Sequence, residues 1–101
     1  MENLKVLLCC GAGISSGFLA SNARKYIKKA GLPITIEARS HTEAAEFMPN
    51  IDVLLLGPHY ASSLETFTEI AKPYGTKVAV IPEAIYASLD GKALVELAQS
   101  L

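Results

Sequence analysis

A cysteine heads a short loop of mostly small residues near the start of this sequence. Cys10 ends the apolar run that begins at Leu4, and it precedes Gly11, Ala12, Gly13, Ile14, Ser15, Ser16 and Gly17. Successive backbone N–H groups in such a loop form a site for an anion, and a following helix adds its positive end. The same field favours a thiolate, so we expect the pKa of Cys10 to be lowered and its sulfur to be nucleophilic. The sequence therefore predicts a phosphocysteine, although spacing alone fits a small buried cysteine before a turn equally well.

Two missing residues decide which phosphoryl chemistry this loop favours. Phosphatases of the tyrosine-phosphatase kind place an arginine six positions after the cysteine, where this chain has Ser16. Without that guanidinium, no bidentate clamp holds the phosphoryl oxygens. Such enzymes also need an aspartic acid, but Asp52 is expected at the wrong edge of the sheet and Asp90 at the start of a helix. Transfer is therefore favoured over hydrolysis, and a small phosphatase or arsenate-reductase-like enzyme remains the alternative.

Composition restricts the class of protein further. The 101 residues are 50% hydrophobic and 19% charged, which predicts one domain over residues 1–101 with a packed core. The net charge of −1 argues against a nucleic-acid partner. No apolar run approaches the roughly 18 residues of a membrane span, and the start does not resemble a signal peptide. We therefore expect a cytoplasmic protein without direct membrane insertion. Its two histidines and two adjacent cysteines lack metal-ligand spacing, so no metal is expected.

Strand and helix patterns alternate four times along the chain. Strands are expected at 4–9, 33–38, 52–57 and 76–81, and helices at about 15–30, 40–48, 61–71, 83–89 and 91–100. The first of these helices is expected to begin at Ser15 or Ser16, and the second at Ser40 or Thr42. Connections of this kind predict an α/β fold with parallel strands. The apolar runs, broken in strand one only by Lys5, make strands one and three central. We therefore expect an open four-stranded sheet in the order 2-1-3-4, truncated flavodoxin-like, with helices on both faces.

This strand order brings a second loop opposite Cys10. The segment from Gly57 to Tyr60 follows strand three and faces the cysteine loop at the switch point of the sheet, where ligands of open α/β sheets bind. His59 and Tyr60 are therefore candidate contacts to the phosphoryl group or a partner, and a surface pair without a role is the other interpretation. Phe18 is expected on the buried stripe of the first helix, the alternative being an exposed docking residue beside the loop. Cys9 is expected in the core.

The run from Leu7 to Ala20 resembles a known amino-terminal signature. It is similar to that of the enzyme IIB component of the lactose/cellobiose (diacetylchitobiose) class of the bacterial phosphoenolpyruvate-dependent sugar phosphotransferase system. That signature reads cysteine, small, alanine, glycine, methionine and then hydroxyl residues, with Ile14 here in place of the methionine. The similarity extends to residues 52–59, to 78–81, and to Tyr86 with Asp90 and Gly91.

The resemblance implies the activity of a protein-phosphohistidine–sugar phosphotransferase. Cys10 would accept a phosphoryl group from a phosphohistidine on a IIA phosphocarrier protein. It would pass the group to a sugar bound by a IIC membrane permease, a β-linked disaccharide such as cellobiose, chitobiose or lactose. The protein would then reach the inner face of the membrane only transiently, through the permease. No cofactor is implied, and the lack of an extra apolar helix face favours a monomer.

Overall fold

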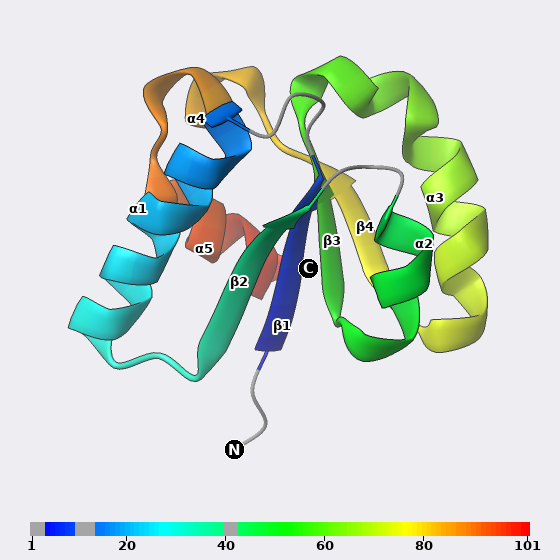
Figure 1. Cartoon of the computed structure of the whole chain (residues 1–101), viewed down its shortest axis with the longest axis horizontal. Coiled ribbons are helices and arrows are strands. Elements are labelled where there is room, and N and C mark those ends of the chain that lie inside the picture. Colours follow the sequence, from blue (N-terminus) through cyan, green and yellow to red (C-terminus); the bar gives the residue numbers. More distant parts are fainter. Residues whose placement is uncertain (1–3, 10–13, 40–42) are drawn as a thin grey trace.

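One four-stranded parallel sheet forms the centre of the computed structural model (Figure 1). The structure describes residues 4–9, 14–39 and 43–101, with residues 14–16 described by their backbone alone. The strands are β1 (Leu4–Cys9), β2 (Ile34–Arg39), β3 (Val53–Leu56) and β4 (Lys77–Val80). They lie in the order β2-β1-β3-β4, and every neighbouring pair is parallel. The predicted fold class and strand order are confirmed.

Helices cover both faces of this sheet. They are α1 (Ile14–Ala30), α2 (Ala44–Phe47), α3 (Leu64–Ala71), α4 (Glu83–Ser88) and α5 (Gly91–Ser100), with short 3-10 segments η2 (Met48–Asn50), η3 (Pro58–Ser63) and η4 (Lys72–Tyr74). Figure 1 shows α1 and α5 on one face and α2 and α3 on the other. The carboxyl ends of the strands point to the top of that view, where the segments leading into α1, α2, η3 and α4 begin.

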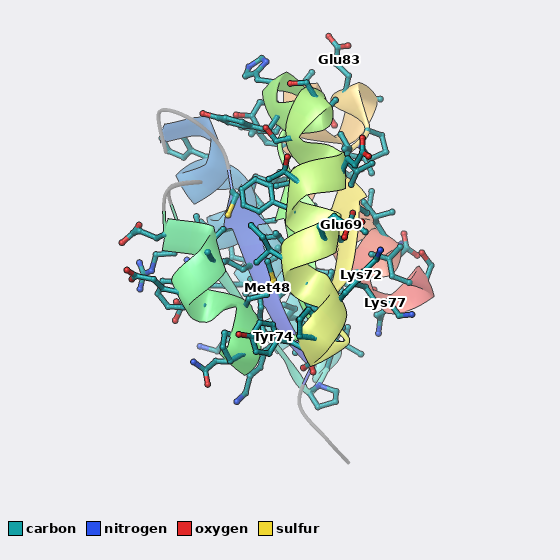
Figure 2. All side chains as sticks on the ribbon, turned by 90° about the vertical axis from the view of Figure 1, so that its right-hand side faces the viewer. Met48, Glu69, Lys72, Tyr74, Lys77 and Glu83 are labelled. Carbon is teal, nitrogen blue, oxygen red and sulfur yellow. The ribbon has the colours of Figure 1, made fainter. Side chains whose placement is uncertain are left out.

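The two central strands contribute to a core on each face, because successive side chains of a strand point to opposite sides. In β1, Val6 and Leu8 pack with α1 and α5, whereas Leu7 and Cys9 pack with α2 and α3. All four residues of β3 are buried in the same alternating way. Figure 2 looks onto the second face, where Met48 lies between α2 and α3. Burial on both faces explains these apolar runs, and the expectation that Cys9 belongs to the core is confirmed.

Two expected helix starts are wrong. The first helix begins at Ile14, ahead of both serines, and the helix expected from residue 61 begins at Leu64. Its preceding turn, η3, includes Tyr60 at φ −108° and ψ 19°, which is not helical, so an α-helix cannot run through it. The second helix is reduced to α2, and Glu43 precedes it without a side-chain cap. The alternative caps Ser40 and Thr42 lie outside the described residues.

The start of α5 is fixed against α1. The Asp90 side chain accepts a hydrogen bond from the Ala93 N–H at 3.0 Å, so the expected helix cap is confirmed. On the preceding residue, the Leu89 carbonyl accepts a hydrogen bond from Nδ2 of Asn22 in α1 at 2.9 Å. Gly91, the first residue of α5, is buried against α1. The turn between α4 and α5 is therefore held to α1 by both a polar contact and close backbone packing.

Candidate functional site

The carboxyl ends of β1 and β3 are joined by a backbone hydrogen bond. The Gly57 N–H donates to the Cys9 carbonyl at 2.9 Å, and the Ile81 N–H donates to the Leu56 carbonyl at 2.7 Å. The parallel ladder thus continues one residue past β3 and β4. The segments that leave β1 and β3 begin side by side, which agrees with the predicted switch point between these two strands. Cys10 is bonded directly to Cys9, although Cys10, Gly11, Ala12 and Gly13 lie outside the described residues.

The amino end of α1 follows this segment. The N–H groups of Ile14, Ser15 and Ser16 belong to the first three helical residues, which have no acceptor within the helix. No acidic residue occupies the first turn of α1, so no carboxylate of that turn offsets the positive end of the helix. Ser15 and Ser16 lie inside this turn rather than ahead of it, which adds their N–H groups to the set. Three N–H donors without an intrahelical acceptor, on a helix end whose own first turn has no acidic side chain, suit an anion.

Phe18 does not lie on the buried stripe of α1. Its exposed fraction is 60%, whereas Leu19 and Ala20 beside it are fully buried. The buried stripe continues through Ala23 and Ile27, and Phe18 lies outside it on the same side of the helix as exposed Lys25. The expectation that Phe18 is a core residue is therefore wrong. A large exposed aromatic side chain on the first turns of α1 fits the alternative, an apolar docking residue.

The loop after β3 sends its two aromatic residues in different directions. His59 is exposed, and its ring meets the Tyr86 ring edge-on, with centroids 5.9 Å apart and an interplanar angle of 73°. Tyr60 is partly buried against the core formed with α2 and α3. The structure therefore brings His59 to α4 at the carboxyl edge and directs Tyr60 into the fold. Tyr86 was missed as a partner of His59, and the adjacency of β3 and β4 was the signal that could have found it.

Arg39 is a second residue that the sequence analysis missed. It ends β2 and lies opposite Cys9 in the register of the parallel pair. Its Nη2 is 3.2 Å from Oε2 of Glu37, and its guanidinium carbon lies 5.4 Å from the centre of the Phe47 ring. The side chain is 43% exposed. A positive charge therefore stands at the carboxyl edge, on the strand next to the one that carries the cysteine.

The described part of the chain has neither a metal-binding cluster nor a membrane-spanning helix. Within residues 4–9, 14–39 and 43–101, no three or more histidine, cysteine, aspartate and glutamate side chains gather in a way that could hold a metal ion. Over the same stretches, no helix combines the length and apolar character needed to cross a membrane.

Comparison with known proteins decides the family. The sequence model described as "PTS system, Lactose/Cellobiose specific IIB subunit" matches residues 5–97. The chain belongs to this family. As a IIB family member, it is a component of a sugar phosphotransferase system of the lactose/cellobiose class, and the resemblance of the cysteine loop is confirmed at the level of the family.

Individual IIB relatives agree over nearly the whole chain. The oligo-beta-mannoside-specific EIIB component of Bacillus subtilis is 32% identical over 97 residues, which cover 96% of this chain and 94% of that protein. The solution structure of a cellobiose-specific IIB component from Borrelia burgdorferi is 32% identical, with a TM-score of 0.80 over 98% of this chain and 91% of that one. The lactose-specific IIB domain from Streptococcus pneumoniae, at 20% identity and a TM-score of 0.86 over 97% of each chain, shows the same fold.

A longer relative matches this chain over a small part of its length. The lactose-specific EIICB component of Staphylococcus haemolyticus is 28% identical over 100 residues. The match covers 97% of this chain but only 17% of that protein. The remainder of the EIICB component therefore has no counterpart in this sequence.

Proposed function

We propose that Cys10 is the phosphoryl carrier of this IIB protein. It accepts a phosphoryl group from a phosphohistidine on a IIA partner and passes it to a sugar bound by a IIC permease. Residues 1–101 act as one unit, a monomer that meets its two partners in turn. The loop from Gly11 to Gly17 holds the phosphoryl oxygens through backbone N–H groups, with the hydroxyls of Ser15 and Ser16 as further donors.

The transfer is two in-line displacements at phosphorus. In the first, an electron pair of the Cys10 thiolate forms the S–P bond while the P–N bond breaks and its electrons stay on the imidazole nitrogen. The thiol releases one proton to solvent, and the departing imidazole takes one up. In the second, a sugar hydroxyl oxygen forms the O–P bond, the hydroxyl proton passes to solvent, and the S–P electrons return to sulfur as the thiolate. Beyond the Cys10 nucleophile, the protein takes part in few covalent changes. Positioning of the reacting groups and stabilisation of their charge therefore account for most of the catalysis.

One observation supports this assignment most directly. The carboxyl end of β1 leads to Cys10, and the chain then enters a helix whose first turn has three N–H groups without an intrahelical acceptor and no acidic side chain. That arrangement favours both the thiolate before transfer and the phosphoryl group after it. Family membership supplies the class of reaction, because the IIB family belongs to sugar phosphotransferase systems.

The names of the relatives support a β-linked sugar and a permease partner. The similar proteins are named for oligo-beta-mannoside, cellobiose and lactose. From these names we infer a β-linked disaccharide or a related β-glycoside as the acceptor. The EIICB name of the longer relatives supports a IIC component as the partner that presents this sugar.

Mass spectrometry of the intact protein tests the proposal. The protein is incubated with phosphoenolpyruvate, the general phosphotransferase proteins and the IIA partner, and peptide mapping then locates any added phosphate. We expect one phosphate on Cys10, lost on treatment with iodine, as a thiophosphate should be. An unmodified protein, or phosphate on another residue, would overturn the assignment. Steady hydrolysis of p-nitrophenyl phosphate instead would favour the phosphatase.

Phe18 offers a separate prediction about partner docking. Phe18→Ala should raise the concentration of phosphorylated IIA needed for half-maximal transfer by about tenfold, because truncating a docked aromatic residue typically removes more than about 1 kcal/mol of binding. The free energy of unfolding should change by less than about 0.5 kcal/mol, since the side chain is 60% exposed. Transfer assays at a series of IIA concentrations measure the first quantity. Unfolding in urea measures the free energy.

Tyr74→Ala is the matched control for Phe18→Ala. Tyr74 is also an exposed aromatic residue, with an exposed fraction of 53%, but it lies in η4 near the opposite end of the molecule (Figure 2). Its removal should leave the IIA dependence unchanged. Equal behaviour of the two variants would exclude Phe18 from the docking surface.

A further inference from the structure

We propose that the free edge of β2 binds an extended, acidic segment of a partner protein as an added strand. β2 lies at one margin of the sheet and pairs with β1 alone (Figure 1). All six of its residues are in register with β1, so an edge of the same length remains on the other side. A strand edge of this kind is a template for a further strand. The inference does not depend on the chemistry of the cysteine.

Every second residue of β2 directs its backbone N–H and C=O groups away from β1. The Leu4 N–H donates to the Pro33 carbonyl at 2.9 Å, so the odd-numbered residues of this stretch face β1. The direction alternates along a parallel strand, and the even-numbered residues therefore face outward. These are Ile34, Ile36 and Ala38. Among the described residues, only Arg24 of α1 bonds an outward group, with its Nε 2.9 Å from the Ile36 carbonyl oxygen.

A groove borders β2 on each face of the sheet. The groove on the α1 side has a volume of about 330 Å³, and the groove on the α2 side has a volume of about 210 Å³. Thr35 and Glu37 line both grooves, which therefore meet at the strand. Successive side chains of an added strand point to opposite faces, so they would enter the two grooves in turn.

The groove on the α1 side is positively charged. Arg24 and Lys28 line it, and neither forms an ion pair with a described residue. Glu37, the acidic residue of its lining, is already paired with Arg39 at 3.2 Å. A segment with a carboxylate at every second position would place those carboxylates beside two unpaired cations. Charge complementarity therefore favours an acidic segment.

Arg24 makes the edge selective for such a segment. Its guanidinium covers the Ile36 carbonyl, which is an acceptor that an added strand needs. A carboxylate accepts two parallel hydrogen bonds from a guanidinium, and these are stronger than a bond to a neutral carbonyl. An acidic segment therefore draws Arg24 off the carbonyl, whereas a neutral or basic segment meets a covered position. The same cover protects the edge from unspecific pairing.

A second copy of this chain is a poorer occupant of the edge. Two β2 edges would pair antiparallel about a twofold axis perpendicular to the sheet, which places both α1 helices on the same face. Arg24 and Lys28 of one copy would then face the same cations of the other copy, and like charges repel. A partner of opposite charge avoids this repulsion.

Amide hydrogen exchange, followed by NMR on the full chain, tests the inference. The probe is an acetylated peptide of about eight residues, the length of a strand, in which valine and glutamate alternate. The control peptide has lysine in place of glutamate. Before peptide is added, the outward amides of Ile34, Ile36 and Ala38 should exchange faster than the inward amides between them. With acidic peptide at about ten times its dissociation constant, the outward amides should exchange about tenfold more slowly, because only the free fraction is open. The lysine peptide should not slow them.

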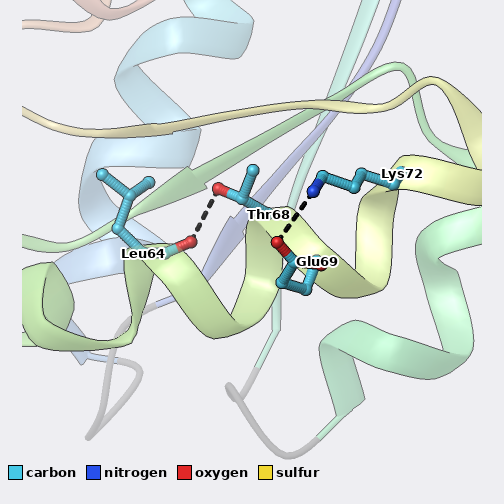
Figure 3. A network of polar contacts seen from close by, with 4 residues as sticks. All are labelled: Leu64, Thr68, Glu69 and Lys72. Carbon is cyan, nitrogen blue, oxygen red and sulfur yellow. Dashed lines mark hydrogen bonds and ion pairs between the residues drawn. The ribbon is translucent and has the colours of Figure 1, made fainter.

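Lys28→Glu and Lys72→Glu are a matched pair of variants. Lys28→Glu places a carboxylate in the groove on the α1 side and should raise the dissociation constant of the acidic peptide about tenfold. Lys72→Glu makes the same change of charge in η4, where Lys72 is paired with Glu69 at 2.8 Å (Figure 3), and should leave binding unchanged. Equal weakening by both variants would show that net charge alone attracts the peptide, and the inference would be wrong.

Three other results would also contradict the inference. Peptide binding without slower exchange of the outward amides would place the peptide on the cations of α1 rather than on the strand. Slow exchange of these amides before peptide is added, increasing with protein concentration, would assign the edge to a second copy. Binding to phosphatidylglycerol vesicles but not to the peptide would assign the cations to a lipid surface.

Discussion

Cys10→Ser is expected to lower phosphoryl acceptance from IIA by several orders of magnitude. A serine hydroxyl at neutral pH is not ionised, whereas a thiol in a field of backbone N–H groups is readily converted to the nucleophilic thiolate. Removal of a nucleophile is among the most damaging changes an enzyme can suffer. Any phosphate that reached the serine would form a stable ester and would not pass on to a sugar. Quantitative mass spectrometry over time, followed by addition of permease-containing membranes and sugar, measures both steps.

Cys9→Ala separates the effect of Cys10 from that of its neighbour. Cys9 is fully buried in the core with α2 and α3, so its loss should reduce stability by about 1 kcal/mol through the small cavity it leaves. Phosphate should still be accepted at close to the wild-type rate below the melting temperature. Normal transfer by Cys10→Ser, or loss of transfer by Cys9→Ala in a folded protein, would show that the carrier has been assigned to the wrong residue.

The sheet could be predicted because its central strands are buried on both faces. The strand that ends at Leu56 is wholly apolar, the strand that ends at Cys9 is interrupted only by Lys5, and the connections between strands are long enough for helices. Those two features predict β1 and β3 in the middle and place the cysteine at a switch point. The helix cap at Asp90 could also be predicted, because it depends only on Asp90 and on the helix that follows it in the sequence.

The residues that were missed depend on contacts between distant segments. Arg39 gains its interest from its register with Cys9, and Tyr86 from the ring of His59, and neither pairing leaves a pattern in the nearby sequence. Phe18 was misplaced for a related reason. Its apolar character placed it on the buried stripe, but the residues of α1 that pack on the sheet are Leu19, Ala20, Ala23 and Ile27, and Phe18 lies outside that face. Tertiary packing decides those cases.

Gly91→Ala is expected to destabilise the protein by about 3 kcal/mol. A Cβ atom on Gly91 would stand 2.4 Å from the Ala23 nitrogen and 2.4 Å from the Asn22 carbonyl carbon. These are backbone atoms of α1, so no side-chain rotation can relieve the overlap and the two helices must move apart. Overpacking of this kind typically costs about 1–3 kcal/mol, and contact with backbone belongs at the upper end. The same movement would lengthen the 2.9 Å hydrogen bond from Asn22 to Leu89.

Gly17→Ala provides the matched control for that experiment, since it adds the same methyl group in the first turns of α1. A Cβ atom on Gly17 has no atom within 4 Å, and alanine there should stabilise the helix by about 0.5–1 kcal/mol. Thermal unfolding followed by circular dichroism should show a melting temperature about 10–20 °C lower for Gly91→Ala and slightly higher for Gly17→Ala. If Gly91→Ala melts with the wild type, α1 and α5 are not packed backbone to backbone. Opposite shifts from one chemical change would show that the close approach at Gly91, rather than glycine content, joins the carboxyl-terminal helix to the helix that follows the cysteine loop.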